Sequence, residues 1–324
     1  MKHYDRYTFI KLLAVLLIFS ASVNIFLYLN GMMTEDRYIE SRNAKIELLP
    51  SRIAWANTEQ YIKFQKNYST SYLELRESII KVLKNSSNKG HYGVYFENLS
   101  SGAGCGVNEE EGFLPASLLK LPIMVAVLKK IEEGKLSLDK KVSLAPEDID
   151  LRSGSLGSKG AGYQITIKEL LVYLIKESDN TAATTLLRFI TPRECARVII
   201  TVGMSPELYH GDEVTVSPKQ YSNMLGSIYY AEYLNRIFSE LSLSIMSETD
   251  YNKQISAGVP SNINISHKYG EYHLSGERHG YNDCGIIFHP DTPYLLCVMS
   301  KNNAKDEAEK TISEISKVVY EYVN

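Results

Sequence analysis

A serine and a lysine three positions apart begin a long apolar segment of this chain. Ser117 and Lys120 flank two leucines, and the apolar run continues to Leu128. In a helix these two positions share a face, so the lysine amine reaches the serine hydroxyl. Because Pro122 has no amide hydrogen, the helix begins near it and Ser117 lies at the positive end of the helix dipole. The pair has the chemistry of a nucleophile with its own base, although a solvent-exposed helix start gives the same pattern.

Two other polar segments could meet this pair. Ser178, Asp179 and Asn180 end the apolar stretch LLVYLIKE and place a hydroxyl, a carboxylate and an amide on one loop. A helix end closed by an Asx turn is the alternative interpretation. Further on, Lys268 lies two positions before Gly270 in strand-like sequence, where a glycine permits close approach of a ligand and a lysine can hold an anion. The alternative there is an edge strand with a solvated lysine.

Helical and strand patterns alternate along the chain and define the elements that must position these residues. A capping-box pattern at Ser71 and Glu74 predicts a helix, and residues 91–98 and 104–110 predict a hairpin. Further helices are predicted at residues 118–128 and after Thr166, Thr191 and Ser217. The chain ends with strand patterns at residues 264–272, 284–288 and 294–300 and a helix at 306–323. This order predicts an α+β fold, with an antiparallel sheet built from N- and C-terminal strands around a helical subdomain.

Composition indicates a folded chain with a sizeable core. Its 324 residues are 44% hydrophobic and 23% charged, and the formal net charge is −3. These values exclude disordered, collagen-like and coiled-coil proteins, and without a basic surplus we expect no nucleic-acid partner. The four cysteines and seven histidines show no spacing typical of a metal site, so we expect neither a metal nor another cofactor.

The N-terminal region predicts a single membrane anchor. Residues 12–29 carry no charge over 18 positions, which approaches the ~20 residues that a helix needs to cross a bilayer. Basic residues precede this stretch and acidic residues follow it, so we expect a cytoplasmic N-terminus and an extracytoplasmic catalytic domain. A cleaved signal peptide, which would give a secreted protein, is the less favoured alternative. The predicted organisation is an anchor at residues 1–32, a spacer at 33–68 and a catalytic domain at 69–324.

Taken in order, the three polar segments resemble the Ser-x-x-Lys, Ser-Asp-Asn and Lys-(Thr/Ser)-Gly motifs of class A β-lactamases and penicillin-binding proteins. The sequences around Ser117 and Ser178 are similar to that family beyond the motifs themselves. The resemblance covers about residues 70–324. It implies the β-lactamase/transpeptidase-like fold and a serine hydrolase that acts on a β-lactam or a related cell-wall peptide amide.

The resemblance also implies a role for each residue of the site. Ser117 would attack a carbonyl carbon to form an acyl-enzyme, with Lys120 as the proton acceptor and Ser178 as the relay to the leaving nitrogen. The backbone amides of Ser117 and Glu271 would form the oxyanion hole. Asp179 would brace its loop. The residues that would bind the substrate are Asn180, Lys268, Tyr269 and Gly270.

Three departures from the family pattern weaken the case for efficient hydrolysis and for the usual substrate recognition. The lactamases carry a glutamate that activates the deacylating water, but the nearest segment here, residues 205–209, has a serine at that place. Three loop acids could substitute, although solvated acids are the favoured interpretation: Glu207, Asp212 and Glu213. Tyr269 replaces a small hydroxyl residue, and the arginine that some lactamases use for the substrate carboxylate is missing, with Arg278 as a weak substitute.

Cys284 and Cys297 lie symmetrically about a predicted turn at residues 290–291. A tight hairpin would place them opposite each other, which allows a disulfide in an oxidising compartment. Because cysteine is among the most buried residue types, we favour two buried free thiols.

The sequence therefore predicts a monomeric, membrane-anchored serine hydrolase of the class A β-lactamase family that forms an acyl-enzyme at Ser117. Its expected partners are the membrane and a small-molecule or peptidoglycan-peptide substrate. Because the deacylating glutamate is not evident, two alternatives stay open. One is a penicillin-binding sensor module without turnover, and the other is a D-alanyl carboxypeptidase or esterase.

Overall fold

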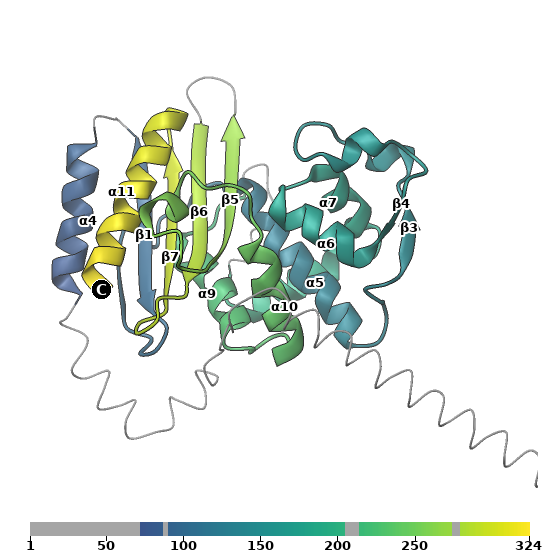
Figure 1. Cartoon of the computed structure of the whole chain (residues 1–324), viewed down its shortest axis with the longest axis horizontal. Helices are drawn as coiled ribbons and strands as arrows, with labels where there is room; N and C mark the ends of the chain where they lie inside the picture. Colours follow the sequence, from purple (N-terminus) through teal and green to yellow (C-terminus); the bar gives the residue numbers. More distant parts are fainter. Residues whose placement is uncertain (1–71, 87–89, 205–213, 274–278) are drawn as a thin grey trace, which may run out of the picture. The chain divides into compact units, whose positions relative to one another are not determined.

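The computed structural model describes residues 72–86, 90–204, 214–273 and 279–324. In this part of the chain five strands form an antiparallel sheet in the order β2-β1-β7-β6-β5 (Figure 1). The strands are β1 (His91–Asn98), β2 (Gly104–Val107), β5 (Ile265–His273), β6 (His279–Ile287) and β7 (Tyr294–Lys301). N- and C-terminal strands join where β1 pairs with β7 along its whole length. The predicted α+β fold, closed by strands distant in sequence, is confirmed.

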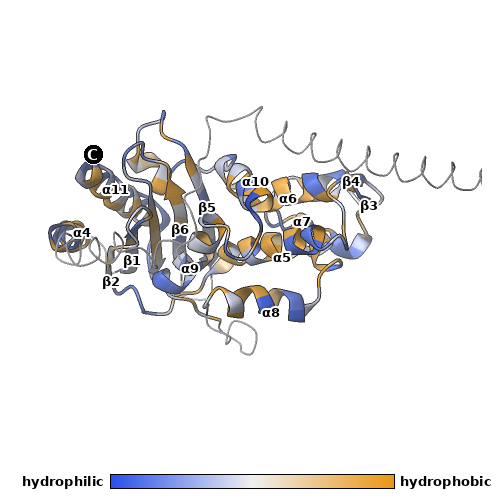
Figure 2. Ribbon diagram, turned by 90° about the horizontal axis from the view of Figure 1, so that it is seen from below, coloured by the Kyte–Doolittle hydropathy of each residue, from blue (hydrophilic) through white to orange (hydrophobic). Residues whose placement is uncertain are grey.

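Helices cover both faces of this sheet. On one face α4 (Leu73–Asn85) and α11 (Lys305–Val323) pack against each other and against an apolar core that includes Leu75, Phe96 and Ile312. On the other face α9 (Pro218–Tyr229) contacts β1, β6 and β7. Figure 2 shows the sheet between these two helical layers.

A helical subdomain surrounds α5 (Lys120–Glu132), which contacts four other helices. Eight of its first nine residues are buried, so the predicted helix with little exposed surface is confirmed. Its neighbours are α6 (Ile167–Lys176), α7 (Asn180–Leu187), α8 (Pro192–Thr201) and α10 (Arg236–Ser247). A small hairpin of β3 (Lys141–Ser143) and β4 (Gln164–Thr166) completes the subdomain.

Helix starts follow the local chemistry of the sequence in three cases. The side chains of Thr166, Thr191 and Ser217 each accept a hydrogen bond from the amide three residues later, as the capping boxes predict. At α4, by contrast, Tyr72 is the N-cap and no side chain caps the helix, while Ser71 lies outside the described residues. Ser117 also differs from its expected place, because it lies in a 3₁₀ turn, η1 (Ala116–Leu119), that precedes α5.

The cysteine pair corrects one expectation. Cys284 on β6 lies directly opposite Cys297 on β7, and the two form a disulfide. The preference for two free thiols is therefore wrong. Statistics of cysteine burial favoured it, whereas the register of the hairpin decides which side chains meet.

The predicted membrane span at residues 12–29 lies outside the described residues, as do the predicted boundaries of the anchor and the spacer. Over the described ranges, none of the helices combines the length and the apolar character that crossing a membrane requires. The anchor, the spacer and the domain boundaries stay predictions.

Candidate active site

Ser117 lies on a strained turn beside an edge strand. Ala116 has a φ of 49°, in the left-handed region that residues with a Cβ rarely adopt. Such strain persists only where the surroundings hold it, and it is concentrated at functional sites. Strand β5 passes next to the turn, because a Cβ added at Gly270 would lie 2.7 Å from the Pro115 carbonyl oxygen and 3.2 Å from the Ser117 amide nitrogen. Glycine at 270 thus permits close approach of the turn that carries Ser117, whereas the sequence predicts close approach of a ligand at this position.

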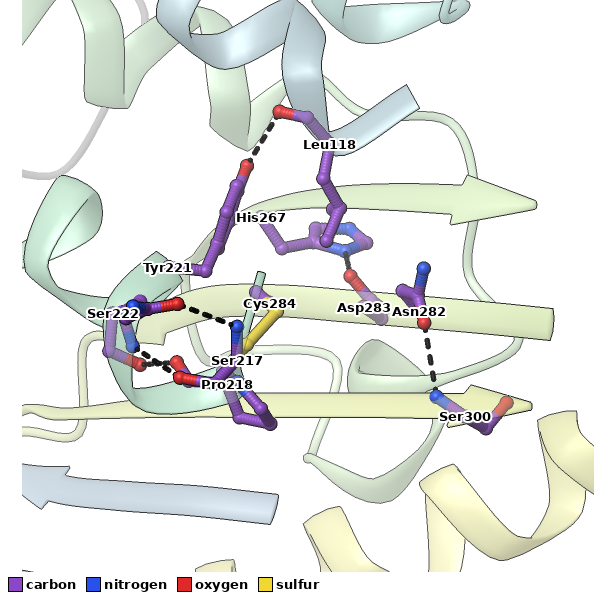
Figure 3. Close-up of a disulfide and its surroundings, with 12 residues drawn as sticks. Leu118, Ser217, Pro218, Tyr221, Ser222, His267, Asn282, Asp283, Cys284 and Ser300 are labelled. Atoms are coloured by element: carbon purple, nitrogen blue, oxygen red, sulfur yellow. Dashed lines mark hydrogen bonds and ion pairs between the residues drawn. A yellow bond between two sulfur atoms is a disulfide. The ribbon is translucent and has the colours of Figure 1, made fainter. Parts of the chain in front are cut away.

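The same turn is fixed from the sheet and from α9. The Tyr221 hydroxyl donates to the Leu118 carbonyl at 3.0 Å, and Figure 3 shows the tyrosine reaching across to it. The Asn282 side-chain amide donates to the Leu114 carbonyl at 2.9 Å. Because these donors come from rigid elements, the position of the nucleophile does not depend on α5 alone.

Lys120 connects the nucleophile with the Ser-Asp-Asn segment. Its Nζ lies 3.2 Å from Ser117 Oγ, 3.1 Å from Ser178 Oγ and 2.8 Å from Asn180 Oδ1. The amine also donates to the Ser178 carbonyl. The two carbonyl-type oxygens only accept, so they occupy two N–H groups of the amine. A neutral amine would keep its lone pair for one of the two hydroxyl hydrogens, which is the arrangement that a general base needs.

The protonation state of Lys120 follows from its burial. Desolvation lowers the pKa of Lys120 to about 8, against the attraction of Asp179 and Asp150 for the charged form. Burial likewise lowers the pKa of Lys268 well below its ordinary value, and the charge of Lys120 lowers it further. A neutral amine is therefore accessible at Lys120 near neutral pH.

The Ser-Asp-Asn segment is held by a buried carboxylate. Ser178 has a φ of 54°, again in the left-handed region. Asp179 accepts hydrogen bonds from the amides of Ala182 and Leu156, both at 2.8 Å, and so joins the start of α7 to the loop that borders the site. A Cβ at Gly154 would lie 2.0 Å from the Asp179 carboxylate. This geometry suits the bracing role that the resemblance implies for Asp179.

The Lys268 side chain lies near Lys120, and the Tyr269 ring covers its amine. Its side chain is fully buried, and its Nζ donates to the Tyr269 carbonyl at 2.8 Å. The same nitrogen lies 4.2 Å from the centre of the Tyr269 ring, which stacks on Tyr251 with 4.2 Å between ring centres. Burial raises the pKa of the Tyr269 hydroxyl to about 12. The amine is therefore enclosed by backbone and rings.

The backbone of Glu271 reaches the free edge of the sheet. The His267 carbonyl accepts a hydrogen bond from Thr249, which lies outside the sheet, at 3.0 Å. Because backbone direction alternates along a strand, the amide and carbonyl groups of residues 269 and 271 also point away from β6. This is the edge beside Ser117, where the resemblance places an oxyanion hole. The Glu271 side chain instead binds Lys305, with N–O distances of 2.9 and 3.1 Å.

These elements enclose a cleft of about 600 Å³. It is lined by Ser117, Arg152, Ser153, Asn180, Tyr251, Tyr269, Glu271, Tyr272, His273 and Lys305. The structure thus brings Ser117, Lys120, Ser178 and Asn180 together, with Lys268 adjacent. Apart from Glu271, which was expected to contribute its backbone amide, sequence reasoning missed the lining residues outside the three motifs, since no spacing links them to the motifs.

The structure does not describe the remaining residues that the sequence offered for deacylation and for binding the substrate carboxylate. Glu207, Asp212, Glu213 and Arg278 lie outside the described residues. Within the described ranges no group of three or more His, Cys, Asp or Glu residues could hold a metal ion. His267 instead pairs with the buried Asp283 at 2.8 Å (Figure 3).

Comparison with known proteins identifies the family of this chain. A model of the beta-lactamase enzyme family matches residues 74–323. Beta-lactamase VEB-1 of Pseudomonas aeruginosa is 27% identical in an alignment of 283 positions that covers 79% of this chain and 92% of the relative. A beta-lactamase of Streptomyces albus G is 25% identical over 236 residues, covering 67% and 74% of the two chains.

Solved structures show the same fold. The structure of PBP-A has a TM-score of 0.68 and 26% identity over 77% of this chain and 95% of its own. A beta-lactamase from Chitinophaga pinensis, 22% identical, has a TM-score of 0.70 and covers 78% of this chain and 100% of its own. With the family model spanning three quarters of its length, this chain belongs to the beta-lactamase enzyme family, the serine hydrolases of the class A type.

Proposed function

We propose that this protein reacts with β-lactams or related cell-wall peptide amides and forms an acyl-enzyme at Ser117. The observation that carries the proposal is the position of Lys120, whose amine contacts the Ser117 and Ser178 hydroxyls at once. A buried amine with a pKa of about 8 is suited to accept a hydroxyl proton near neutral pH.

The proposed reaction uses each group in one step. Lys120 takes the Ser117 hydroxyl proton as Oγ bonds to the carbonyl carbon. The negative charge on the carbonyl oxygen is stabilised by the backbone amides of Ser117 and Glu271, each worth ~3 kcal/mol in comparable sites. The proton then passes through the Ser178 hydroxyl to the leaving nitrogen, the C–N bond breaks, and an ester at Ser117 remains.

The binding roles follow from where the other side chains lie. Asn180 contacts Lys120 and lines the cleft, so it can hold both the amine and an amide group of the substrate. Lys268 lies beneath the Tyr269 ring, so in its protonated form it would act on a substrate anion through positive potential rather than by direct contact. Gly270 lets β5 approach the turn that carries Ser117, so the edge of the strand would lie beside a bound substrate, and Asp179 holds the loop.

The fate of the acyl-enzyme separates two functions, a β-lactamase and a penicillin-binding protein with slow turnover. Two observations favour slow turnover. Among the described residues Glu271 is the carboxylate that lines the cleft, and it is bound to Lys305. A mutant of PBP-A, 27% identical to this chain, has been solved as an acyl-enzyme complex with penicillin G.

We also propose that the catalytic domain lies outside the cytoplasmic membrane. The uncharged stretch at residues 12–29 and the charges that flank it support an anchor. The disulfide between Cys284 and Cys297 supports an oxidising compartment. Protease protection of the full chain in intact cells tests the arrangement, because an exposed domain is digested without lysis.

A labelled penicillin tests the reaction itself. Mass analysis after incubation is expected to place one adduct on the peptide that contains Ser117, and Ser117→Ala is expected to carry none. Nitrocefin then separates the two functions. Colour release that stops after one equivalent identifies a penicillin-binding protein, and continuing release that Ser117→Ala abolishes identifies a lactamase. An unmodified wild-type protein after saturating exposure would contradict the proposal.

A further inference from the structure

The wall of the cleft beyond the nucleophile carries a pair of opposite charges. Glu271 follows Gly270, which passes next to the Ser117 turn, and its side chain binds Lys305 at the start of α11. Both side chains line the cleft and keep part of their surface exposed, 21% for Glu271 and 43% for Lys305. A substrate in the cleft would therefore meet both charges.

The position of Lys305 is unfavourable for the helix that carries it. Lys305 is the first residue of α11, where the helix dipole disfavours a cation, and no side chain caps this end. The lysine is tied back by Glu271 and lies 3.9 Å from Glu309. Glu309 in turn accepts from the Tyr251 hydroxyl at 2.7 Å, so the pair is fixed to the aromatic wall. A cation held at an unfavourable helix position, in a cleft, indicates a role in recognition.

The direction of the substrate decides which part of it reaches the pair. Ser178, which would protonate the leaving nitrogen, lies with Lys120 on the helical side of Ser117. Lys268 and the stacked rings of Tyr269 and Tyr251 lie at the middle of β5, and Glu271 follows two residues after Tyr269. The acyl part lies on the other side of the carbonyl carbon from the leaving nitrogen, so it would extend along the free edge of β5 towards His273 and past Glu271 and Lys305, which lie against the Tyr251 ring.

We propose that Glu271 and Lys305 select substrates whose acyl part ends in a zwitterionic amino-acid group. The substrate ammonium would approach the Glu271 carboxylate, and the substrate carboxylate would approach Lys305. The two pairs would replace the present pair, so neither charge is left without a partner. This inference rests on the proposed function and names the substrate class of the same site.

Two cephalosporins that differ in one ammonium group test the inference. Cephalosporin C carries an aminoadipyl side chain, and its adipyl analogue lacks the amine. We expect the second-order rate of Ser117 acylation to be about fivefold higher for cephalosporin C, the range of a partly exposed ion pair. The preference should decline between 20 mM and 500 mM salt, because screening weakens exposed charges.

Variants of Glu271 and Lys305 test whether these two side chains cause the preference for cephalosporin C. Glu271→Gln keeps the backbone amide, and the rate ratio between the two probes is expected to fall to about one. Because both probes are measured on the same variant, any change in the oxyanion hole cancels from the ratio. Lys305→Gln is expected to lower the rate for both probes, since both carry the terminal carboxylate. Glu321→Gln breaks a distant pair on the same helix and should keep the wild-type ratio.

The outcomes separate this inference from the proposed function. If both probes acylate the wild-type protein at equal rates, or if Glu271→Gln keeps the fivefold ratio, the zwitterion preference is refuted while acylation at Ser117 stands. If neither probe nor a labelled penicillin modifies Ser117, both proposals fail.

Discussion

Two buried lysines at one cleft differ in what surrounds them. Lys120 contacts two hydroxyls, an amide oxygen and a backbone carbonyl, all from segments that could touch the reacting atoms. Lys268 contacts a carbonyl and the face of the Tyr269 ring. The family motif residues proposed for acylation are thus all present, whereas the pattern is altered where a substrate anion would be held. Chemistry and recognition can change separately on one scaffold.

Removing the first lysine should have the largest effect. Lys120→Met is expected to lower the acylation rate by about 10³-fold, because a general base contributes 10²–10⁴-fold. Stopped-flow measurement with nitrocefin under single-turnover conditions checks the value. Lys130→Met, ten residues later on α5 and paired with Glu194 at the surface, is the matched control and should stay within about threefold of wild type. A comparable loss in both variants would assign the effect to folding.

The disulfide behind the second lysine should affect stability. Cys284 lies opposite Lys268 on the neighbouring strand, and the bond closes a loop with a sequence separation of 13 residues. Replacing both bonded cysteines by alanine is expected to lower the free energy of unfolding by about 3 kcal/mol. Urea denaturation measures it. Cys105→Ala, at a free cysteine of the same sheet, should change it by less than about 1 kcal/mol. Equal effects from both changes would show that the disulfide adds little.

Removing the ring that covers Lys268 should raise the acylation rate, by a smaller factor than the loss expected for Lys120→Met. Tyr269→Thr is expected to raise the acylation rate with penicillin G about tenfold, because a hydrogen bond to a charged group is worth about 1.5–3 kcal/mol. The gain should appear in substrate affinity and vanish in Tyr269→Thr combined with Lys268→Met. If Tyr269→Thr binds penicillin G no better than wild type, the ring does not restrict the anion site.

Local signals in the sequence predicted more of the fold than of the cleft. The capping boxes at Thr166, Thr191 and Ser217 act within four residues, and the structure has all three. The disulfide depends on hairpin register, so cysteine burial alone gave the wrong preference. Hairpin pairing is a two-strand property that single-residue statistics do not contain.

In the candidate site too, residues in local motifs were predicted from the sequence, and residues brought in by tertiary packing were not. Motifs indicated Ser117, Lys120 and Ser178, whose chemistry is visible from their types and spacing. Lys305 and Tyr251 line the cleft because α11 and the segment before β5 pack beside it. No local sequence pattern predicts such packing. Tyr269 was recognised as a departure, but only the structure shows that its ring covers Lys268.

The pH dependence of acylation tests most directly whether Lys120 accepts the Ser117 proton. The reactive form has a neutral amine, and burial lowers the pKa of Lys120 to about 8. The rate of adduct formation at Ser117 should therefore rise about tenfold per pH unit below this value and level off above it. Mass analysis of quenched samples between pH 5.5 and 9.5 gives that rate, and Lys120→Met should show no such rise. A wild-type rate that stays constant across this range would contradict the account.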